Sequence, residues 1–345
     1  MSFFNKTILL TGHTGFKGAW LAEWLLLRGA RIVGYSKDIP TDPALFSLLN
    51  LADRLDDHRG DIREKGTVAK LVRDTQPDYV FHLAAQPLVR YSYREPLETY
   101  ETNVLGTAYL LDALRALEKP CAAVLVSTDK CYENREWKHA YRESDPMGGH
   151  DPYNSSKGAA ELVIQGYRQS YFQNHPVRLA SARADNVIGG GDFSPDRILP
   201  DCIRALANQE PIPVRNPAAT RPWQHVLEPL SGYLRLAEKL SEQAELSPSY
   251  NFGPALASNR PVEALVEKAL QYWKGTWEDQ SDPHAPPEAT LLNLASDLAF
   301  HDLHWTPRWN FETTIEKTLQ GYQAWHNQAD LLALTRQQIE EYEGS

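Results

Sequence analysis

A glycine-rich loop near the start of the chain limits its possible folds more than any other feature. Residues 11–18 read Thr-Gly-His-Thr-Gly-Phe-Lys-Gly, and they join an apolar run at 7–10 to a helical pattern at 17–28. Such a turn needs backbone that can adopt positive φ, and it lets the helix pack closely on the strand. The first amide groups of the helix would then face a phosphate. We therefore predict a dinucleotide-binding unit here rather than an ordinary strand-to-helix turn.

Strand-like runs and helical patterns alternate through the first half of the chain. Continuous apolar strands separated by helices form parallel sheets that are covered on both faces. Right-handed crossovers then give a doubly wound α/β fold of the Rossmann type. The further strand-like runs lie at 31–34, 79–82, 122–127 and 177–183, and the helical patterns lie at 64–75, 96–117 and 153–174.

The second half is less regular and rich in proline. At about 150 residues per domain, the length predicts a Rossmann domain at 1–180 and a smaller α/β substrate-binding lobe at 181–345. The boundary near residue 180 is soft, because segments of the second lobe can return to the first. We expect helices at 227–242, 262–274, 311–326 and 331–342, and a surface loop at 279–287.

The charge balance excludes several classes of partner. Lys plus Arg total 35 and Asp plus Glu total 45, which gives a net charge of -10, whereas binding to nucleic acid or to anionic membranes relies on basic side chains. We see no apolar stretch of the roughly 18 residues that a membrane span needs, and no secretory signal pattern. Cys121, Cys131 and Cys202 have no CxxC spacing. We therefore expect no disulfide, no metal site and a cytoplasmic location.

Two residues in the helical pattern at 153–174 have the spacing of a catalytic pair. Tyr153 and Lys157 are four residues apart, so their side chains share one face of the helix. A free tyrosine has a pKa of about 10, but a nearby ammonium and a cationic nicotinamide would favour the phenolate. That phenolate could take the proton of a sugar hydroxyl. Spacing alone would fit a surface pair, but the upstream dinucleotide loop favours a site at the carboxyl ends of the strands.

The triplet Thr128-Asp129-Lys130 directly follows the strand-like run at 122–127. Thr128 could hold a substrate hydroxyl, and the acid and base beside it indicate a second chemical step. Once a sugar carries a ketone at C4, its C5 proton becomes acidic. Lys130 could then remove that proton while Asp129 protonates the departing C6 hydroxyl. Lys130 would have to be uncharged part of the time, and spacing alone would favour a solvated turn pair.

The choice of cofactor depends on the residues after the second strand-like run. An acidic residue there favours NAD through its ribose hydroxyls, whereas a cation would accept the extra phosphate of NADP. Lys37 and Asp38 are both present, and we favour NAD with Asp38.

Together these segments resemble the extended short-chain dehydrogenase/reductase superfamily and, within it, the CDP-glucose 4,6-dehydratases. The Asp129–Lys130 pair is the specific part of the resemblance, because the related dTDP-glucose dehydratases carry Asp–Glu there. One departure is Asp185, where the family usually has glycine; a carboxylate near the nicotinamide pocket could alter the affinity for substrate or cofactor. The resemblance rests on residues 11–18, 83–90, 126–137, 141–143, 151–158, 186–192 and 221–226.

The resemblance implies roles for named residues. Catalysis falls to Thr128, Asp129, Lys130, Tyr153 and Lys157. With the loop and Asp38, the NAD-binding set is Gly12, His13, Thr14, Gly15, Phe16, Lys17, Gly18, Asp38, Asp61, Ile62, Leu83, Ala84, Ala85, Asn103, Ser127, Tyr153 and Lys157. The substrate-binding set is Gln86, Asn186, Arg197, Leu199, Val214, Arg215 and Arg221.

The implied reaction is NAD-dependent oxidation at C4, loss of water across C5–C6 and reduction at C6, which turns CDP-glucose into its 4-keto-6-deoxy derivative. The alternatives are an epimerase, a 4,6-dehydratase for another nucleotide, and a dinucleotide-sensing module without chemistry; Thr128, Tyr153 and Lys157 argue against the last. The helices at 96–117 and 153–174 resemble those that form a four-helix homodimer interface in the superfamily.

Overall fold

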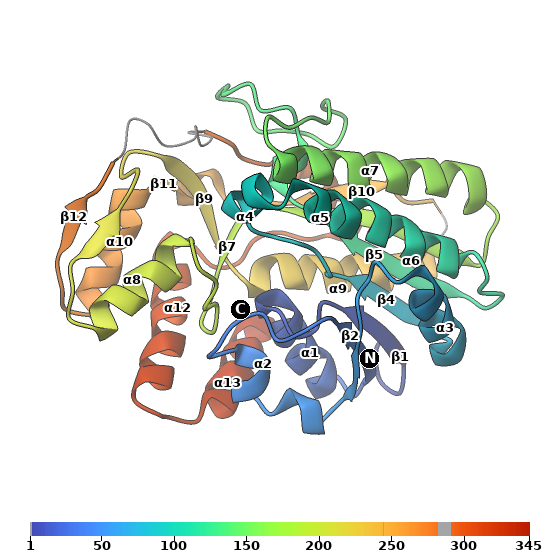
Figure 1. Cartoon of the computed structure of the whole chain (residues 1–345), viewed down its shortest axis with the longest axis horizontal. Helices are drawn as coiled ribbons and strands as arrows, with labels where there is room; N and C mark the ends of the chain where they lie inside the picture. Colours follow the sequence, from blue (N-terminus) through green and yellow to red (C-terminus); the bar gives the residue numbers. More distant parts are fainter. Residues whose placement is uncertain (1, 244, 282–290) are drawn as a thin grey trace.

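The computed structural model describes residues 2–243, 245–281 and 291–345. Its main feature is a parallel sheet built from β1 (Thr7–Thr11), β2 (Arg31–Ser36), β3 (Asp56–Arg59), β4 (Tyr79–His82), β5 (Cys121–Val126), β6 (Val177–Ala184) and β10 (Ser249–Phe252). Across the described residues the strand order is β10-β6-β5-β4-β1-β2-β3 (Figure 1), and each neighbouring pair is parallel. The predicted doubly wound Rossmann fold is therefore confirmed.

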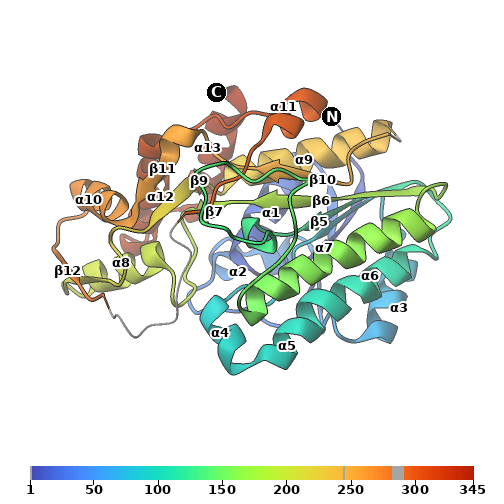
Figure 2. The ribbon, with the colours of Figure 1, turned by 90° about the horizontal axis from the view of Figure 1, so that it is seen from above.

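Helices cover both faces of this sheet (Figure 2). On β1, Ile8 and Leu10 pack into one core and Leu9 packs into the other, because successive side chains of a strand point to opposite faces. One layer contains α1 (Phe16–Leu27), α9 (Leu227–Glu242), α11 (Asp297–Leu303) and α13 (Leu331–Gly344), and the other contains α3 (Lys65–Thr75), α6 (Gly106–Leu114) and α7 (Pro152–Tyr171).

The second half of the chain contributes to more than one core. A separate core lies among α8 (Ile198–Ala207), α10 (Val262–Tyr272) and α12 (Phe311–His326), with the strands β7 (Asn186–Ile188), β8 (Ile212–Val214), β9 (Thr220–His225), β11 (Asn259–Pro261) and β12 (Trp277–Asp279). In the described part of the chain these strands form a sheet in the order β11-β9-β7 and a pair of β12 with β8. By contrast, α9 and β10 return to the main sheet, where β10 pairs with β6.

The helices expected in the second half are present. The predicted ranges 227–242 and 311–326 match α9 and α12, while α10 ends at Tyr272 and α13 runs to Gly344. Of the surface loop expected at 279–287, residues 282–287 lie outside the described residues, and residue 279 ends β12. Within the described ranges, each helix is too short or too polar to cross a membrane.

The single helix expected at 96–117 was wrong in its interior. The chain forms α5 (Pro96–Tyr100), a π-helical turn η2 (Glu101–Leu105) and then α6, which ends at Leu114. Such a turn is commonly a local widening of an α-helix near a functional site. Asn103, which is 2% exposed, lies in this turn.

Candidate active site

The glycine loop forms a close backbone cradle between β1 and α1. Gly12 has a φ of +76°, and a Cβ there would lie 2.6 Å from the backbone nitrogen of Ala84. A Cβ on Gly18 would overlap the carbonyl oxygen of Gly12, so the start of α1 lies directly against the loop. Gly15 precedes α1 and supplies no side-chain cap to its first amides. Those amides therefore remain available to an anion.

Polar side chains of the loop fasten it to the neighbouring strands. The buried ring of His13 contacts Asp57 Oδ1 at 2.8 Å through Nε2 and Ser36 Oγ at 2.9 Å through Nδ1. Burial lowers the pKa of His13, although Asp57 opposes this shift. Thr14 donates a hydrogen bond from Oγ1 to the carbonyl of Asp38 at 2.7 Å. These predicted cofactor residues thus shape the loop with their side chains.

The acidic residues expected near the adenosine lie after β2 and β3, at one edge of the sheet. Asp38 is exposed. Asp61 accepts hydrogen bonds from Nε and Nη2 of Arg63, and these bonds hold the pKa of Asp61 below its ordinary value. The Lys37 ammonium lies 3.3 Å from Glu98 and 3.9 Å from Asp61. The cation next to Asp38 is therefore already paired with carboxylates.

The segment after β4 is tied to the glycine loop. Leu83 and Ala84 donate backbone hydrogen bonds to Thr11, to its carbonyl at 3.0 Å and to its Oγ1 at 3.2 Å. Ala85 follows directly and is half-buried. The side chain of Gln86, a predicted substrate residue, donates to Thr99 Oγ1 at 2.9 Å.

Asn103 joins this segment to α7. Its Oδ1 accepts from the backbone nitrogen of Gln86 at 2.9 Å, and its Nδ2 donates to Gln86 O at 3.1 Å and to Ser156 Oγ at 2.9 Å. Ile62 lies nearby and fills the space beside Gly106, where a Cβ would come within 2.7 Å of Ile62 Cγ2. Asn103 and Ile62 thus support the cofactor side of the site through packing and hydrogen bonds.

The turn after β5 holds the predicted acid and base in direct contact. Thr128 Oγ1 donates to Asp129 Oδ1 at 2.6 Å, and Lys130 Nζ lies 3.2 Å from both carboxylate oxygens. Asp129 is fully buried, while the Lys130 side chain is 27% exposed. Ser127 continues the strand pairing to Ala182. The turn η3 (Asp129–Cys131) therefore holds Asp129 and Lys130 as a direct ion pair, rather than as two separately solvated side chains.

The first two turns of α7 carry Tyr153 and Lys157, and Tyr153 lies against this ion pair. Asp151 caps the helix by accepting from the Asn154 backbone nitrogen at 2.9 Å. Tyr153 is 7% exposed and interacts with Thr128 and Asp129. Burial, with Asp129, raises the pKa of Tyr153 above 10 in this structure, contrary to the shift expected from Lys157 and a nicotinamide. Burial lowers the pKa of Lys157 to about 8.

Two further cations complete the charged cluster. Burial lowers the pKa of Lys17 to about 7, assisted by Arg197 and opposed by Asp129. Lys17 Nζ lies 3.5 Å from the hydroxyl of Tyr233 on α9. Arg197 donates to Asp192 Oδ2 at 3.0 Å and interacts with Tyr153. Lys17, which we expected only as part of the loop, is thus a charged neighbour of the predicted catalytic groups.

The other predicted substrate residues are spread through the second lobe. Asn186 begins β7 and is half-buried. Leu199 and Val214 point their side chains into the lobe's core. Arg215 forms ion pairs with Asp196 and Asp201, both at 3.2 Å. Arg221 lies on β9, opposite Arg260 of β11, and donates to Thr220 O at 2.9 Å.

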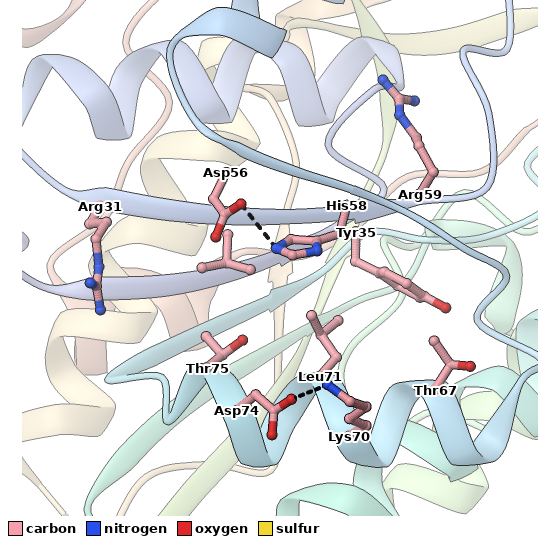
Figure 3. Close-up of a pocket in the computed structure, with 11 residues that line it drawn as sticks. Arg31, Tyr35, Asp56, His58, Arg59, Thr67, Lys70, Leu71, Asp74 and Thr75 are labelled. Atoms are coloured by element: carbon pink, nitrogen blue, oxygen red, sulfur yellow. Dashed lines mark hydrogen bonds and ion pairs between the residues drawn. The ribbon is translucent and has the colours of Figure 1, made fainter.

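A hollow on the outer edge of the sheet does not belong to this site. It has a volume of about 370 Å³ and is lined by β2, β3 and α3, including Tyr35 and Arg59 (Figure 3). The charged side chains around it are paired locally, His58 with Asp56 and Lys70 with Asp74. The predicted site residues do not line it.

One supporting contact of the site had not been predicted. Glu161, four residues after Lys157 on α7, accepts 2.7 Å hydrogen bonds from Arg183 and Ser181 of β6. Arg183 and Glu161 form a buried ion pair that fixes α7 to the sheet. An acidic residue on the same helical face as Tyr153 and Lys157 was the available signal, but its partner on another strand was not.

This fold, with Tyr153 of α7 facing Thr128 after β5, is that of the extended short-chain dehydrogenase/reductases. The chain belongs, more narrowly, to the family described as GDP-mannose 4,6 dehydratase, whose model matches residues 9–318.

Relatives narrow this assignment further. The chain is 45% identical over 346 residues to a CDP-glucose 4,6-dehydratase of Salmonella typhimurium, covering 98% of this chain and 96% of that one. It is 26% identical to a dTDP-glucose 4,6-dehydratase of Xanthomonas campestris, over 92% of this chain and 93% of that one.

Solved structures share the fold. A UDP-glucose-4-epimerase from Stenotrophomonas maltophila with bound NAD has a TM-score of 0.81 at 19% identity, covering 94% of this chain and all of that one. A dTDP-glucose 4,6-dehydratase from Streptomyces venezuelae, also with NAD, has a TM-score of 0.80 at 22% identity, covering 94% of this chain and 99% of that one.

Proposed function

We propose that the protein converts CDP-D-glucose into CDP-4-dehydro-6-deoxy-D-glucose in deoxysugar biosynthesis, as an NAD-dependent hydro-lyase. The observation that carries this proposal is the contact of the Asp129–Lys130 ion pair with Thr128 and, through it, with Tyr153. An epimerase needs no acid and base beside the threonine, whereas the loss of water does. The 45% identity to a CDP-glucose 4,6-dehydratase supports the choice of nucleotide.

The residues present fit NAD. The cradle at Gly12 and Gly18 has no room for a Cβ, and Ser127 Oγ is a buried hydroxyl with no partner among the described residues. The first amides of α1 would hold the pyrophosphate, and Asp38, Asp61 and Ile62 would line the adenosine. When bound, NAD would supply an acceptor for a hydride and later its donor. Lys157 would hold the nicotinamide ribose.

Tyr153 is the proposed base for the C4 hydroxyl. Thr128 would hold that hydroxyl, and Tyr153 would accept its proton. Because burial and Asp129 raise the pKa of Tyr153, its phenolate needs additional positive charge nearby. Arg197 already acts in that direction, and bound oxidised nicotinamide would add to it.

Asp129 and Lys130 are the proposed acid and base for water loss. Starting from the ion pair, a proton would first pass from Lys130 to Asp129. Lys130 would then take the proton from C5 and Asp129 would give its proton to the leaving C6 oxygen, so that one water forms and the ion pair is restored. The contact between the two groups keeps both at one end of the sheet. General acid and base groups typically contribute about 10²–10⁴-fold each, which is the effect expected from losing either one.

The substrate's nucleotide would lie toward the second lobe. Arg197 belongs to the charged cluster, and we propose that Arg197 and Asn186 contact the sugar and phosphates, with Arg215 and Arg221 further along the same lobe. A guanidinium binds a pyrophosphate in a bidentate fork. Because Leu199 and Val214 point into the core, they would act through their backbone, and Gln86 would have to leave Thr99 to reach a ligand.

We also propose a homodimer through the outer face of α5, η2 and α7. Large apolar side chains are exposed there, and burying them would favour association. The exposed side chains on this face are Leu97, Tyr100, Leu105, Leu162 and Tyr171.

The cysteines of the described chain are free and buried, which supports a reducing, cytoplasmic location.

The test offers CDP-, dTDP-, GDP- and UDP-glucose with NAD in heavy water and reads the products by mass spectrometry. We expect CDP-glucose alone to lose one water and to gain one deuterium at C5. An epimerised product of unchanged mass would refute the proposal. Tyr153→Phe should block C4 oxidation, whereas Lys130→Ala should still oxidise C4 and stop before water loss. Normal turnover by either variant would remove that residue's assigned role.

A further inference from the structure

A row of buried polar side chains lies on the face of the main sheet that α7 covers. Arg183 of β6 pairs with Asn251 of β10, so their side chains point to the same face, and Ser181 lies two residues earlier on that face. Arg183 is 4% exposed and Asn251 is fully buried. Arginine is rarely buried to this extent unless it is paired, so the partners of Arg183 indicate what the row does.

The Arg183 guanidinium bonds to two separate parts of the proposed active site. Its Nη2 donates at 2.7 Å to Oε2 of Glu161, which lies four residues after Lys157 on α7. Its Nη1 donates at 2.6 Å to the hydroxyl of Tyr132, which directly follows the turn η3. One planar group thus joins the helix with the proposed base for C4 oxidation to the turn with the proposed acid and base for water loss.

The side chain of Tyr132 is held on several sides. Its hydroxyl donates to Asn251 Oδ1 at 2.8 Å. Its ring stacks on Tyr141 with 5.4 Å between the ring centres, and the guanidinium carbon of Arg183 lies 5.0 Å from its own ring centre. The backbone nitrogen of Tyr132 donates to the carbonyl of Asp129 at 3.3 Å. The place of the tyrosine ring therefore determines where the turn ends.

The two ends of the turn are held in different ways. At its start, Ser127 continues the strand pairing by donating a backbone hydrogen bond to Ala182 at 2.8 Å. At its end, the Tyr132 hydroxyl carries the bonds described above. Thr128 is next to the end held by the strand, whereas Lys130 is nearer the other end. Loss of the hydroxyl should therefore displace the acid and base of water loss more than the threonine.

We propose that Arg183 is a positioning residue for the proposed reaction: through Glu161 and Tyr132 it holds the acid–base turn in register with the helix of Tyr153, so that water loss follows C4 oxidation on the same bound sugar. This inference rests on the proposed function. An acid or base must lie within hydrogen-bond reach of the proton that it moves, and a misplacement of about 1 Å can cost about a hundredfold in rate.

Tyr132→Phe opens one side of this link and leaves the other side in place. The variant lacks only the hydroxyl that bonds to Arg183 and Asn251. Arg183 keeps its ion pair with Glu161 and its bond to the carbonyl of Glu143 at 3.3 Å, so its charge stays paired. The helix side of the link should therefore keep its geometry.

Tyr250→Phe is the matched control. Tyr250 is a fully buried tyrosine of β10, next to Asn251 but on the opposite face of the sheet. Its hydroxyl also donates once and accepts once, to Asp302 Oδ2 at 2.8 Å and from the backbone nitrogen of Ser247 at 3.1 Å. It thus loses a comparable pair of buried hydrogen bonds away from the proposed site.

Single-turnover experiments with CDP-glucose and NAD separate the two steps. The absorbance of NADH reports C4 oxidation, and the product mass reports water loss. Tyr132→Phe should oxidise C4 at the wild-type rate, lose water about tenfold to a hundredfold more slowly and accumulate NADH, whereas Tyr250→Phe should match wild type in both steps. A general weakening of the fold would slow both steps together, so equal slowing of the two steps in Tyr132→Phe would overturn the inference.

A double variant tests whether Arg183 and Tyr132 act as one unit. Arg183→Lys keeps a positive charge for Glu161 but lacks the planar fork that reaches two partners. It should also slow water loss more than C4 oxidation, and adding Tyr132→Phe to it should slow water loss no further. Effects that multiply in the double variant would contradict the link.

Amide hydrogen exchange in the absence of substrate gives a readout that does not depend on turnover. The amides of Cys131 and Tyr132 donate to the carbonyls of Thr128 and Asp129, and they should exchange about tenfold faster or more in Tyr132→Phe. Tyr250→Phe should leave them unchanged, and unchanged exchange in Tyr132→Phe would overturn the inference. If wild type fails to dehydrate CDP-glucose while this exchange difference is present, the proposed function has failed and the link has not, so the two failures are distinguishable.

Discussion

The hydrogen bonds of Asn103 should carry a measurable share of the stability around the site. Asn103→Ala removes its bonds with the backbone N–H and C=O of Gln86 and with Ser156 Oγ. These bonds connect the segment after β4 to the helix that carries Tyr153. The methyl side chain of alanine cannot form hydrogen bonds, so it does not replace them.

The magnitude follows from the number of bonds lost. A hydrogen bond contributes about 1 kcal/mol net, and a buried group left without a partner costs about 1–3 kcal/mol. Three bonds therefore predict a loss of about 3 kcal/mol in the free energy of unfolding. Ser156→Ala removes one of the Asn103 bonds and also the bond from Ser156 Oγ to the Tyr153 carbonyl, so it should cost about 2 kcal/mol by the same reasoning.

Urea denaturation followed by far-ultraviolet circular dichroism would measure both variants and the double variant. Because the two residues share a bond, the double variant should cost less than the sum of the single changes. An Asn103→Ala cost no larger than that of Ser156→Ala would refute the idea that Asn103 joins three separate groups.

Three further predictions address the cofactor cradle, a buried cation and the dimer. Gly12→Ala should weaken NAD binding about tenfold in calorimetry, because left-handed backbone costs a residue with a Cβ about 1–2 kcal/mol, while Gly66→Ala, with nothing within 4 Å of its Cβ, should bind normally. The pKa of Lys17 is about 7 in the folded protein against 10.5 ordinarily. Between these two pH values the unfolded chain binds more protons than the folded protein, so the stability of the fold should rise with pH in that range. Lys17→Met, measured by thermal melting, should lack that rise. Leu162→Glu should give monomers in analytical ultracentrifugation, whereas Leu256→Glu, outside the proposed interface and 75% exposed in wild type, should not.

The strands and helices of the first half were predictable because each carries its own periodicity. The run at 79–82 is the observed β4, and the glycine loop lies where the strand and helix patterns placed it. No residue range was predicted for β3, because it reads Asp-Asp-His-Arg and lies at the sheet edge, where burial imposes no apolar pattern. The joining of β10 to β6 was also not predictable, since it depends on pairing between distant segments.

Within the site, residue types were more predictable than side-chain directions. The triplet at 128–130 could be assigned from its position after a strand, and its contacts follow from that position. The orientation of the Gln86 side chain toward Thr99 could not be predicted, because Thr99 lies on the separate helix α5, whose position beside Gln86 is set by tertiary packing. Lys17 likewise belongs to the loop by sequence, but its neighbours Arg197 and Tyr233 come from later parts of the chain.

The pairing of β10 with β6 in the main sheet limits where the protein can be truncated. A fragment that stops before residue 249 would leave the hydrogen-bonding groups of β6 without their outer neighbour. Exposed, unpaired strand edges of this kind pair with strands of other chains, and the protein then aggregates. Shortened versions for crystallography or engineering should therefore retain Ser249–Phe252, even when only nucleotide binding is wanted.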